Sequence, residues 1–240
     1  MKKLIVSGCS FTENYAKTIG LKEWPNWPEL LADSLGMELI NLGKSGQGNE
    51  YIYSSLLDTV IKEKNIGLVI AMWTEFQRLD FFINLKKDPH WTALHFPENE
   101  KDRNNISWKN KVMEILHERD LGSDKSNIQR SLRIFFMLQE TMKNLNMPFY
   151  QLMGCCPINR TRNNVKTVCE EIIDSPYLNL VDKDTFMGWP IFGEIDGWHI
   201  DTLLDKYKDV RISSDDTHPN RTGHQIISDM FYRQRRIWRL

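Results

Sequence analysis

The first residues that could take part in a chemical reaction lie near the amino terminus, in the stretch "LIVSGCSFT" from Leu4 to Thr12. An apolar run ends at a glycine and is followed by two potential nucleophiles, Cys9 and Ser10. A serine hydroxyl is a poor nucleophile near neutral pH unless a base with its own orienting group lies beside it. Taken alone, Ser10 is therefore better explained as a residue that caps a turn.

A base and an acid of the required kind occur near the carboxyl terminus, in "SDDTHPNRTGH". Asp215 precedes His218 by three residues, and Pro219 then begins the last predicted helix, so both side chains can share one turn. A carboxylate on one imidazole nitrogen fixes the tautomer and leaves the other nitrogen to take a proton from a serine. Ser10, Asp215 and His218 together form a candidate set for acyl transfer.

These two motifs, G-x-S after the first predicted strand and D-x-x-H-P before the last predicted helix, resemble those of the SGNH, or GDSL, hydrolases. The resemblance spans nearly the whole chain through the order of its strands. It implies a three-layer α/β/α esterase that needs no cofactor or metal, with Ser10 as nucleophile, His218 as base and Asp215 as orienting acid. The implied substrate is a small-molecule or carbohydrate ester, with an O-acetyl group on a carbohydrate as the candidate.

The block "NLGKSGQGN" resembles the family's second motif, in which Gly46 would offer a backbone N–H to the oxyanion beside that of Ser10. The third motif departs from the family, because Glu75 of "MWTEFQR" stands where an oxyanion-binding Asn is usual. An ionised carboxylate there would repel the developing negative charge, so we expect Glu75 to be turned away, protonated, or paired with Arg78. Asn49, one helical turn past Gly46, is the candidate for the missing amide donor.

Two alternatives follow from these departures. Losing one oxyanion donor typically costs about 100- to 1000-fold in rate, so a catalytically inactive SGNH-fold binding or structural module is the rival to an esterase. Cys9 occupies the position where the family usually has Asp. Because neighbouring side chains at a strand end point to opposite sides, Cys9 and Ser10 cannot both face His218, and Cys9 is interpreted as a structural thiol.

The elements that must position these residues are read from hydrophobic periodicity. Short apolar runs predict strands at residues 3–7, 37–41, 67–72, 147–153 and, with a weaker pattern, 177–181. Helical periodicity covers residues 27–36, 49–64, 126–146 and 220–236. Strands that alternate with helices predict an α/β fold, a three-layer α/β/α sandwich with a mostly parallel sheet of about five strands. Ligands bind beyond the carboxyl ends of such strands.

The length of 240 residues suits a single domain over residues 1–240. Two long, irregular segments, 84–107 and 182–201, are predicted to be loop insertions that decide specificity, since loops of this length are usually functional or disordered. Tryptophans lie in or beside the predicted loops, and either sugar stacking or ordinary packing explains them. They are Trp24, Trp27, Trp91, Trp189 and Trp198.

Composition excludes several classes of partner. A formal net charge of -1 gives no electrostatic reason to expect nucleic acid or an anionic membrane. No apolar run approaches the roughly 20 residues of a spanning helix or the roughly 7 to 15 of a secretory signal core. We therefore expect a cytoplasmic protein without a nucleic-acid or membrane partner, while its oligomeric state is not predicted.

Metal binding is likewise not expected. The four cysteines lack paired C-x-x-C spacing, which favours reduced thiols over a zinc site or a disulfide framework. His90 and His95 with Glu98 form the other candidate metal set, but their spacing fits no helical or strand face. His224, six residues after His218, is interpreted as a surface or packing residue.

Overall fold

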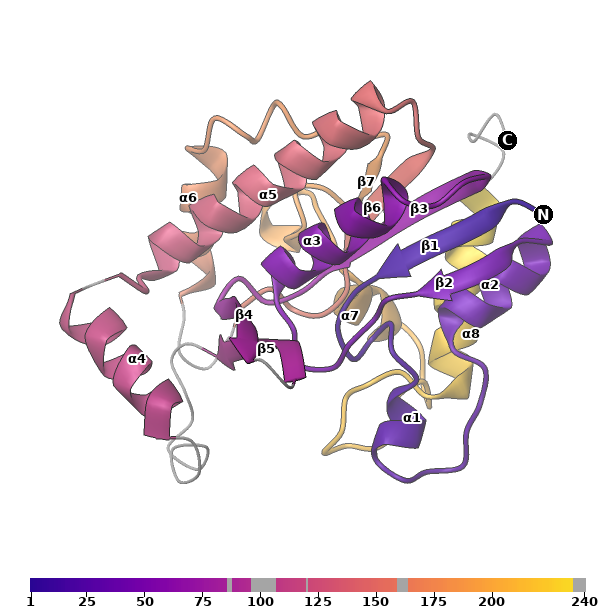
Figure 1. The fold of residues 1–240 in the computed structure, drawn as a ribbon, viewed down its shortest axis with the longest axis horizontal. Coiled ribbons are helices and arrows are strands. Elements are labelled where there is room, and N and C mark those ends of the chain that lie inside the picture. The colour runs from indigo at the N-terminus through magenta and orange to yellow at the C-terminus, as the bar shows by residue number, and fades with distance from the viewer. Residues whose placement is uncertain (86–87, 96–106, 120, 159–163, 235–240) are drawn as a thin grey trace.

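The structure is a computed structural model, which describes residues 1–85, 88–95, 107–119, 121–158 and 164–234. Its middle layer is a five-stranded, fully parallel sheet in the order β2-β1-β3-β6-β7 (Figure 1). These strands are β1 (Lys3–Ser7), β2 (Glu38–Asn41), β3 (Ile66–Trp73), β6 (Phe149–Met153) and β7 (Phe186–Met187). The predicted α/β class and parallel sheet are confirmed.

Helices cover both faces of this sheet (Figure 1). One face is packed by α3 (Asn49–Val60), α5 (Asp124–Asn144) and α6 (Val165–Ile173). The other is packed by α2 (Trp27–Leu35), α7 (Ile200–Leu204) and α8 (Arg221–Gln234). The remaining helices are α1 (Tyr15–Thr18), α4 (Ser107–Glu118) and the 3-10 turn η2 (Gly193–Ile195).

The central strand β3 shows why its apolar run is continuous. Val69 and Ala71 pack with α3 and α5, whereas Leu68 and Ile70 pack with α2 and α8. Side chains of a strand alternate between the two faces of a sheet, so a strand covered on both faces is apolar at every position. The structure thus has two core layers separated by the sheet.

Helix α2 illustrates how local sequence sets the element boundaries. The Asn26 side chain accepts from the Glu29 N–H, and the Glu29 carboxylate accepts in turn from the Asn26 N–H, a complete capping box. Pro28 lies in the first turn, and Gly36 ends the helix in the left-handed conformation at φ 62°. The predicted helix over 27–36 is confirmed.

Two predicted elements need correction. The fifth strand is β7 and not residues 177–181, because those residues form a turn after α6 in which the Val181 N–H donates to the Tyr177 carbonyl at 3.0 Å. The segment 84–107 is also not uniformly irregular. Its described part includes β5 (Asp88–His95), which pairs with β4 (Arg78–Leu85) as a separate antiparallel hairpin.

The hairpin is hard to recognise from sequence because its polar residues do not mark the solvent-exposed positions of an alternating strand. Arg78 and Asp80 lie on one face of β4, yet Asp80 is only 8% exposed. These side chains contact the protein backbone, so a polar residue here does not mark an outward face. The polar sequence of the segment 84–107 therefore predicts a loop, although part of that segment forms a strand.

Candidate active site

Ser10 lies just beyond the carboxyl end of β1, at the start of a tight turn. The Cys9 carbonyl accepts from the Thr12 and Glu13 N–H groups at 2.9 and 3.1 Å, which turns the chain sharply after the strand. Gly8 is required there, because a Cβ at this residue would lie 2.1 Å from Thr12 Oγ1. Ser10 is 7% exposed.

His218 contacts Ser10 in the folded chain. Its Nε2 lies 2.7 Å from Ser10 Oγ, although 208 residues separate the two in the chain. His218 precedes α8 in a loop whose backbone is tied by a hydrogen bond from the Ile212 N–H to the His218 carbonyl at 2.9 Å. Arg211 donates to the Thr217 carbonyl at 2.7 Å and is itself held by Asp201 at 2.8 Å.

The acid beside His218 is Asp216, not Asp215, which corrects the sequence prediction. Asp216 Oδ1 lies 2.6 Å from His218 Nδ1 and also accepts from the His218 backbone N–H at 3.1 Å. A carboxylate that bonds the N–H two residues on forms an Asx turn, which brings its oxygen to the imidazole. Asp215 is exposed, and its Oδ1 is 3.4 Å from Ser214 Oγ.

The geometry assigns the imidazole tautomer. Asp216 Oδ1 can only accept when ionised, so Nδ1–H donates to it and Nε2 accepts from the Ser10 hydroxyl. Partial burial raises the pKa of Asp216, but hydrogen bonds from His218 and Tyr15 outweigh it and hold that pKa below its ordinary value. Asp216 is therefore ionised near neutral pH.

Tyr15 packs on the imidazole, a contact that sequence reasoning missed. Its ring stacks on His218 with centroids 3.8 Å apart and planes at 22°, and the Phe11 ring is 5.3 Å away. Burial, followed by the charge of Asp216 and a hydrogen bond with it, raises the pKa of the Tyr15 phenol. The only sequence signal was an aromatic residue five positions after Ser10 in a predicted loop.

The two oxyanion residues predicted beside Ser10, Gly46 and Asn49, lie in different environments. Gly46 lies in the loop between β2 and α3 with φ 75°, a left-handed conformation that favours glycine. Asn49 begins α3, and its Nδ2 donates to the Thr74 carbonyl and to Ser131 Oγ, both at 3.2 Å. Its Oδ1 accepts from the Thr74 N–H at 2.9 Å. Both amide hydrogens of Asn49 thus have internal acceptors, which contradicts the prediction that its amide is a free donor.

Glu75 is paired with Arg78, which is one of the three alternatives expected from the sequence. Arg78 Nε donates to Glu75 Oε2 at 2.8 Å, and Arg78 Nη1 donates to the Gln47 carbonyl at 3.1 Å. Burial lowers the pKa of Arg78, but the interactions with Glu75, Cys9 and Cys155 together more than offset this effect, and the net shift is upward. The Glu75 charge is therefore balanced by a permanently charged guanidinium.

Cys9 is buried and lies beside Cys155. It is fully inaccessible to solvent, while Cys155 Sγ lies 3.4 Å from Thr74 Oγ1. A hydrogen bond with Cys9, together with burial, raises the pKa of Cys155 well above its ordinary value. All four cysteines are free thiols, and Ser10 is the neighbour that contacts the imidazole.

The remaining histidines do not gather into a metal site. Within the described residues, no group of three or more His, Cys, Asp or Glu side chains could hold a metal ion, and Glu98 lies outside them. His95 Nε2 donates instead to the Gly46 carbonyl at 3.1 Å. His224 is buried in α8, where its Nδ1 accepts from the Trp27 N–H at 3.3 Å. Burial, with a smaller effect of His218, lowers the pKa of His224 to about 4.

The tryptophans divide into two groups. Trp27 and Trp189 are buried, and their indole nitrogens donate to the carbonyls of Phe11 and Leu178, so packing explains them. Trp24, Trp91 and Trp198 are half-buried, and Trp91 lies on the β4–β5 hairpin.

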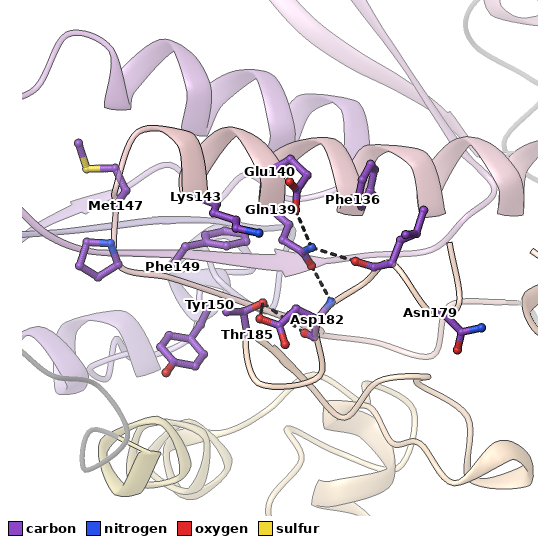
Figure 2. Close-up of a pocket in the computed structure, with 12 residues that line it drawn as sticks. Phe136, Gln139, Glu140, Lys143, Met147, Phe149, Tyr150, Asn179, Asp182 and Thr185 are labelled. Atoms are coloured by element: carbon purple, nitrogen blue, oxygen red, sulfur yellow. Dashed lines mark hydrogen bonds between the residues drawn. The ribbon is translucent and has the colours of Figure 1, made fainter. Parts of the chain in front are cut away.

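A separate cavity of about 910 Å³ lies between α5 and residues 179–185 (Figure 2). Its floor includes Phe149 and Tyr150, at the amino end of β6, whereas Ser10 follows the carboxyl end of the parallel strand β1. In the close-up, Gln139 bridges the two sides by donating to the Leu180 carbonyl and accepting from the Asp182 N–H. The cavity is thus at the opposite edge of the sheet from the candidate active site.

Across the described segments, every helix is too short or too polar to cross a lipid bilayer.

Comparison with known proteins gives similarity in structure only. No protein-family model matches the chain, and no curated protein matches it. Among solved structures, one similar protein is the psychrotrophic esterase EstA from Pseudoalteromonas sp., inhibited by monoethylphosphonate, with a TM-score of 0.55, 14% identity, and coverage of 99% of this chain and 98% of that chain. Another, from Desulfitobacterium hafniense DCB-2 and described as lipolytic and of the G-D-S-L family, has a TM-score of 0.53, 16% identity, and coverage of 98% and 99%. The chain therefore has the α/β fold of GDSL-type lipolytic proteins and esterases.

Proposed function

We propose that the protein is a serine esterase of the SGNH type that hydrolyses small ester substrates through an acyl-enzyme. The observation that carries the proposal is the continuous chain from Ser10 Oγ to His218 Nε2 at 2.7 Å, and from His218 Nδ1 to Asp216 Oδ1 at 2.6 Å. Both distances lie within hydrogen-bond reach for proton transfer. Structural similarity to an esterase over nearly the full length of both chains supports the same class.

The proposed reaction has two steps. Ser10 Oγ attacks the ester carbonyl, His218 Nε2 takes the serine proton, and the same nitrogen then protonates the leaving alcohol. Water, deprotonated by His218, next attacks the acyl-serine and releases the acid and Ser10. Asp216 holds the tautomer and stabilises the imidazolium that forms in each step.

The backbone N–H groups of Ser10 and Gly46 are the proposed oxyanion donors. Asn49 is no longer a candidate, because its amide hydrogens are used in holding Thr74 and Ser131. The pairing of Glu75 with Arg78 removes the objection that a free carboxylate would repel the oxyanion. A site with two backbone donors suits acyl transfer, since donors of this kind are fixed before the reaction begins.

The proposed substrate class includes O-acetyl esters of carbohydrates. Trp91 supports this choice, because a partly exposed indole lies on the hairpin that contacts the Gly46 loop. Its ring packs against Phe82 and Tyr51 at 5.5 and 6.0 Å, which holds the indole in place. A fixed aromatic face is a common platform for a sugar ring.

The rival proposal is a catalytically inactive binding module of the same fold. The observation in its favour is the Asn49 side chain, which leaves the site without a side-chain amide for the oxyanion. The two proposals differ in one measurable property, the reactivity of Ser10.

Labelling with a fluorophosphonate tests the choice directly. We expect the wild-type protein to gain one phosphonyl group on the peptide that contains Ser10, and Ser10→Ala to gain none. Ser214→Ala, an exposed serine in the loop of His218, is the matched control and should be labelled as fast as wild type. Absence of label on wild-type Ser10, or equal hydrolysis of p-nitrophenyl acetate by Ser10→Ala, would support the inactive module.

A further inference from the structure

The β4–β5 hairpin turns one face toward the loop that carries Gly46. Arg78 and His95 are directly opposite in the antiparallel register, and Asp80 follows Arg78 by two residues. Side chains at opposite positions, and at every second position, project from the same face of a hairpin. Arg78, Asp80 and His95 therefore form one row of polar side chains, which we call the hairpin clamp.

Each member of the hairpin clamp binds the backbone of one of three consecutive loop residues. The contacts are His95 Nε2 to the Gly46 carbonyl at 3.1 Å, Arg78 Nη1 to the Gln47 carbonyl at 3.1 Å, and the Gly48 N–H to Asp80 Oδ1 at 2.6 Å. These contacts hold two successive peptide groups, 46–47 and 47–48, from one side, which leaves the loop little freedom to rotate about its own axis.

The clamp is tied to the rest of the molecule at several points. Asp80 Oδ2 also accepts from the Tyr51 N–H at 2.9 Å, so the same carboxylate caps the first turn of α3. Burial raises the pKa of Asp80, and these N–H donors partly offset it. From α5, Arg130 Nη2 donates to the Arg78 carbonyl at 3.0 Å. Glu75 holds the Arg78 guanidinium from the other side at 2.8 Å.

Close approach of the two segments depends on glycine. A Cβ at Gly48 would lie 2.6 Å from Asp80 Oδ2 and 2.8 Å from Arg78 Cβ, so no larger residue fits against the hairpin. Gly46 has room for a side chain, but its φ of 75° would be strained in any other residue. Both the space and the backbone conformation of the loop therefore match the clamp.

We propose that the hairpin clamp of Arg78, Asp80 and His95 positions the oxyanion loop, holding the Gly46 N–H toward Ser10, and that Glu75 serves this function by anchoring Arg78. This inference rests on the proposed esterase activity. It gives the acidic residue a constructive role at the position where an amide is expected, because Glu75 fixes the guanidinium that fixes the loop. The clamp residues are positioning residues and need not touch the substrate.

His95 offers the cleanest test, because it is exposed and lies at the end of its strand. His95→Leu removes the donor to the Gly46 carbonyl, whereas His95→Gln places an amide N–H near the position of Nε2. We expect kcat for p-nitrophenyl acetate to fall about 10-fold in His95→Leu, less than the roughly 100-fold or more for loss of a whole oxyanion donor. We expect KM to stay unchanged and His95→Gln to recover most of the rate.

A transition-state mimic separates positioning from a general loss of structure. Ser10 Oγ adds to the carbonyl of an aryl trifluoromethyl ketone and gives a hemiketal with an oxyanion. The Kd of this ketone should therefore rise in His95→Leu by the same factor by which kcat falls. Arg78→Met should show the same proportionality with a larger change, about 100-fold. Thr92→Val, on the opposite face of β5, is the matched control and should alter neither quantity.

Amide hydrogen exchange of the peptide spanning residues 44–50 tests the clamp without relying on catalysis. We expect faster exchange in His95→Leu and Arg78→Met than in wild type or Thr92→Val, with unchanged exchange in α5. Unchanged exchange in the loop, or a ketone Kd that does not follow kcat, would overturn the clamp. If wild-type Ser10 takes up no fluorophosphonate, the esterase proposal fails and the exchange result alone decides whether the clamp holds the loop.

Discussion

The two adjacent carboxylates in "SDDTH" have the same charge and lie in the same turn, but their surroundings differ. Asp216 accepts from both the backbone and the ring of His218, whereas Asp215 is exposed beside Ser214. A carboxylate orients an imidazole only when its oxygen reaches the ring nitrogen with good geometry. Of the two residues, Asp216 meets that condition.

The pair provides a matched test of the proposed acid. Asp216→Asn is expected to lower kcat by about 1000-fold, because an amide in this position no longer favours the Nδ1–H tautomer that leaves Nε2 free to accept. Asp215→Asn should retain wild-type kcat. Steady-state hydrolysis of p-nitrophenyl acetate measures both, and the reverse order of effects would reassign the acid to Asp215.

Tyr15 gives a second prediction for single residues. Its ring stacks on His218, so it should stabilise the imidazolium formed during proton transfer. Tyr15→Leu is expected to lower kcat by about 3- to 10-fold, which corresponds to the roughly 0.5 to 1.5 kcal/mol of an aromatic pair. Tyr15→Phe keeps the stacking and should lose less. Equal rates in all three proteins would show that the stacking has no influence on the reaction.

Among the elements, the contact between α2 and α8 contains a buried titratable group. His224 of α8 accepts from the first N–H of α2, at Trp27, and the Trp27 ring stacks on Phe231 with centroids 4.9 Å apart. Protonation of His224 would remove its acceptor and place a charge in the core. The interface between these helices is therefore sensitive to acid.

Because folding lowers the pKa of His224, the sign of the pH dependence of the free energy of unfolding follows directly. The pKa of His224 is about 4 in the folded protein and 6.5 for the ordinary side chain. As pH falls below 6.5, the unfolded chain binds a proton that the folded chain does not, so the free energy of unfolding decreases. Most of this loss, about 2 to 3 kcal/mol, is expected between pH 6.5 and pH 4.5.

His224→Asn tests this expectation, because the amide keeps an acceptor for Trp27 and does not titrate. Between pH 7 and pH 4.5, urea unfolding should show a smaller loss of stability in the variant than in wild type, by about 2 to 3 kcal/mol. Parallel pH profiles for the two proteins would refute a neutral, buried His224.

For the molecule as a whole, the sheet separates two core layers and brings distant residues to one edge. Ser10 follows β1, the Gly46 loop follows β2 and Glu75 follows β3, all at the carboxyl ends of parallel strands. The cavity that Figure 2 shows is lined by Phe149 and Tyr150 at the amino end of β6 and so lies at the opposite end of the strands. The cavity and the candidate active site are therefore at opposite ends of the parallel strands.

Helix α5 provides a test of the core. Phe135 is fully buried and contacts the rings of Trp73 and Phe186, whereas Met137 on the same helix is 43% exposed. Phe135→Ala is expected to lower the free energy of unfolding by about 3 to 5 kcal/mol. Met137→Ala should change it by less than about 0.5 kcal/mol.

Urea denaturation measures both variants. An unchanged denaturant slope in both would confirm that they differ from wild type only in stability. A small effect of Phe135→Ala would contradict the packing of α5 against the sheet.

Hydrophobic periodicity determined four of the five strands of the parallel sheet and the main helices, because strands such as β3 are buried on both faces and helices such as α2 carry complete start and stop signals. The residue types of the two terminal motifs also made Ser10 and His218 joint candidates. These predictions concern residues whose environment follows from local pattern and from the direction of parallel strands.

Tertiary structure alone decided the choice between Asp215 and Asp216, the internal hydrogen bonds of Asn49 and the hairpin clamp. Each depends on where a polar atom points after the chain has folded, to within a fraction of an ångström. Residue type and spacing do not carry that information, since a buried polar group is satisfied by whichever partner the packing brings within hydrogen-bond reach. The sequence by itself thus determined the fold and two members of the candidate site, and packing determined the third member and the support of the oxyanion loop.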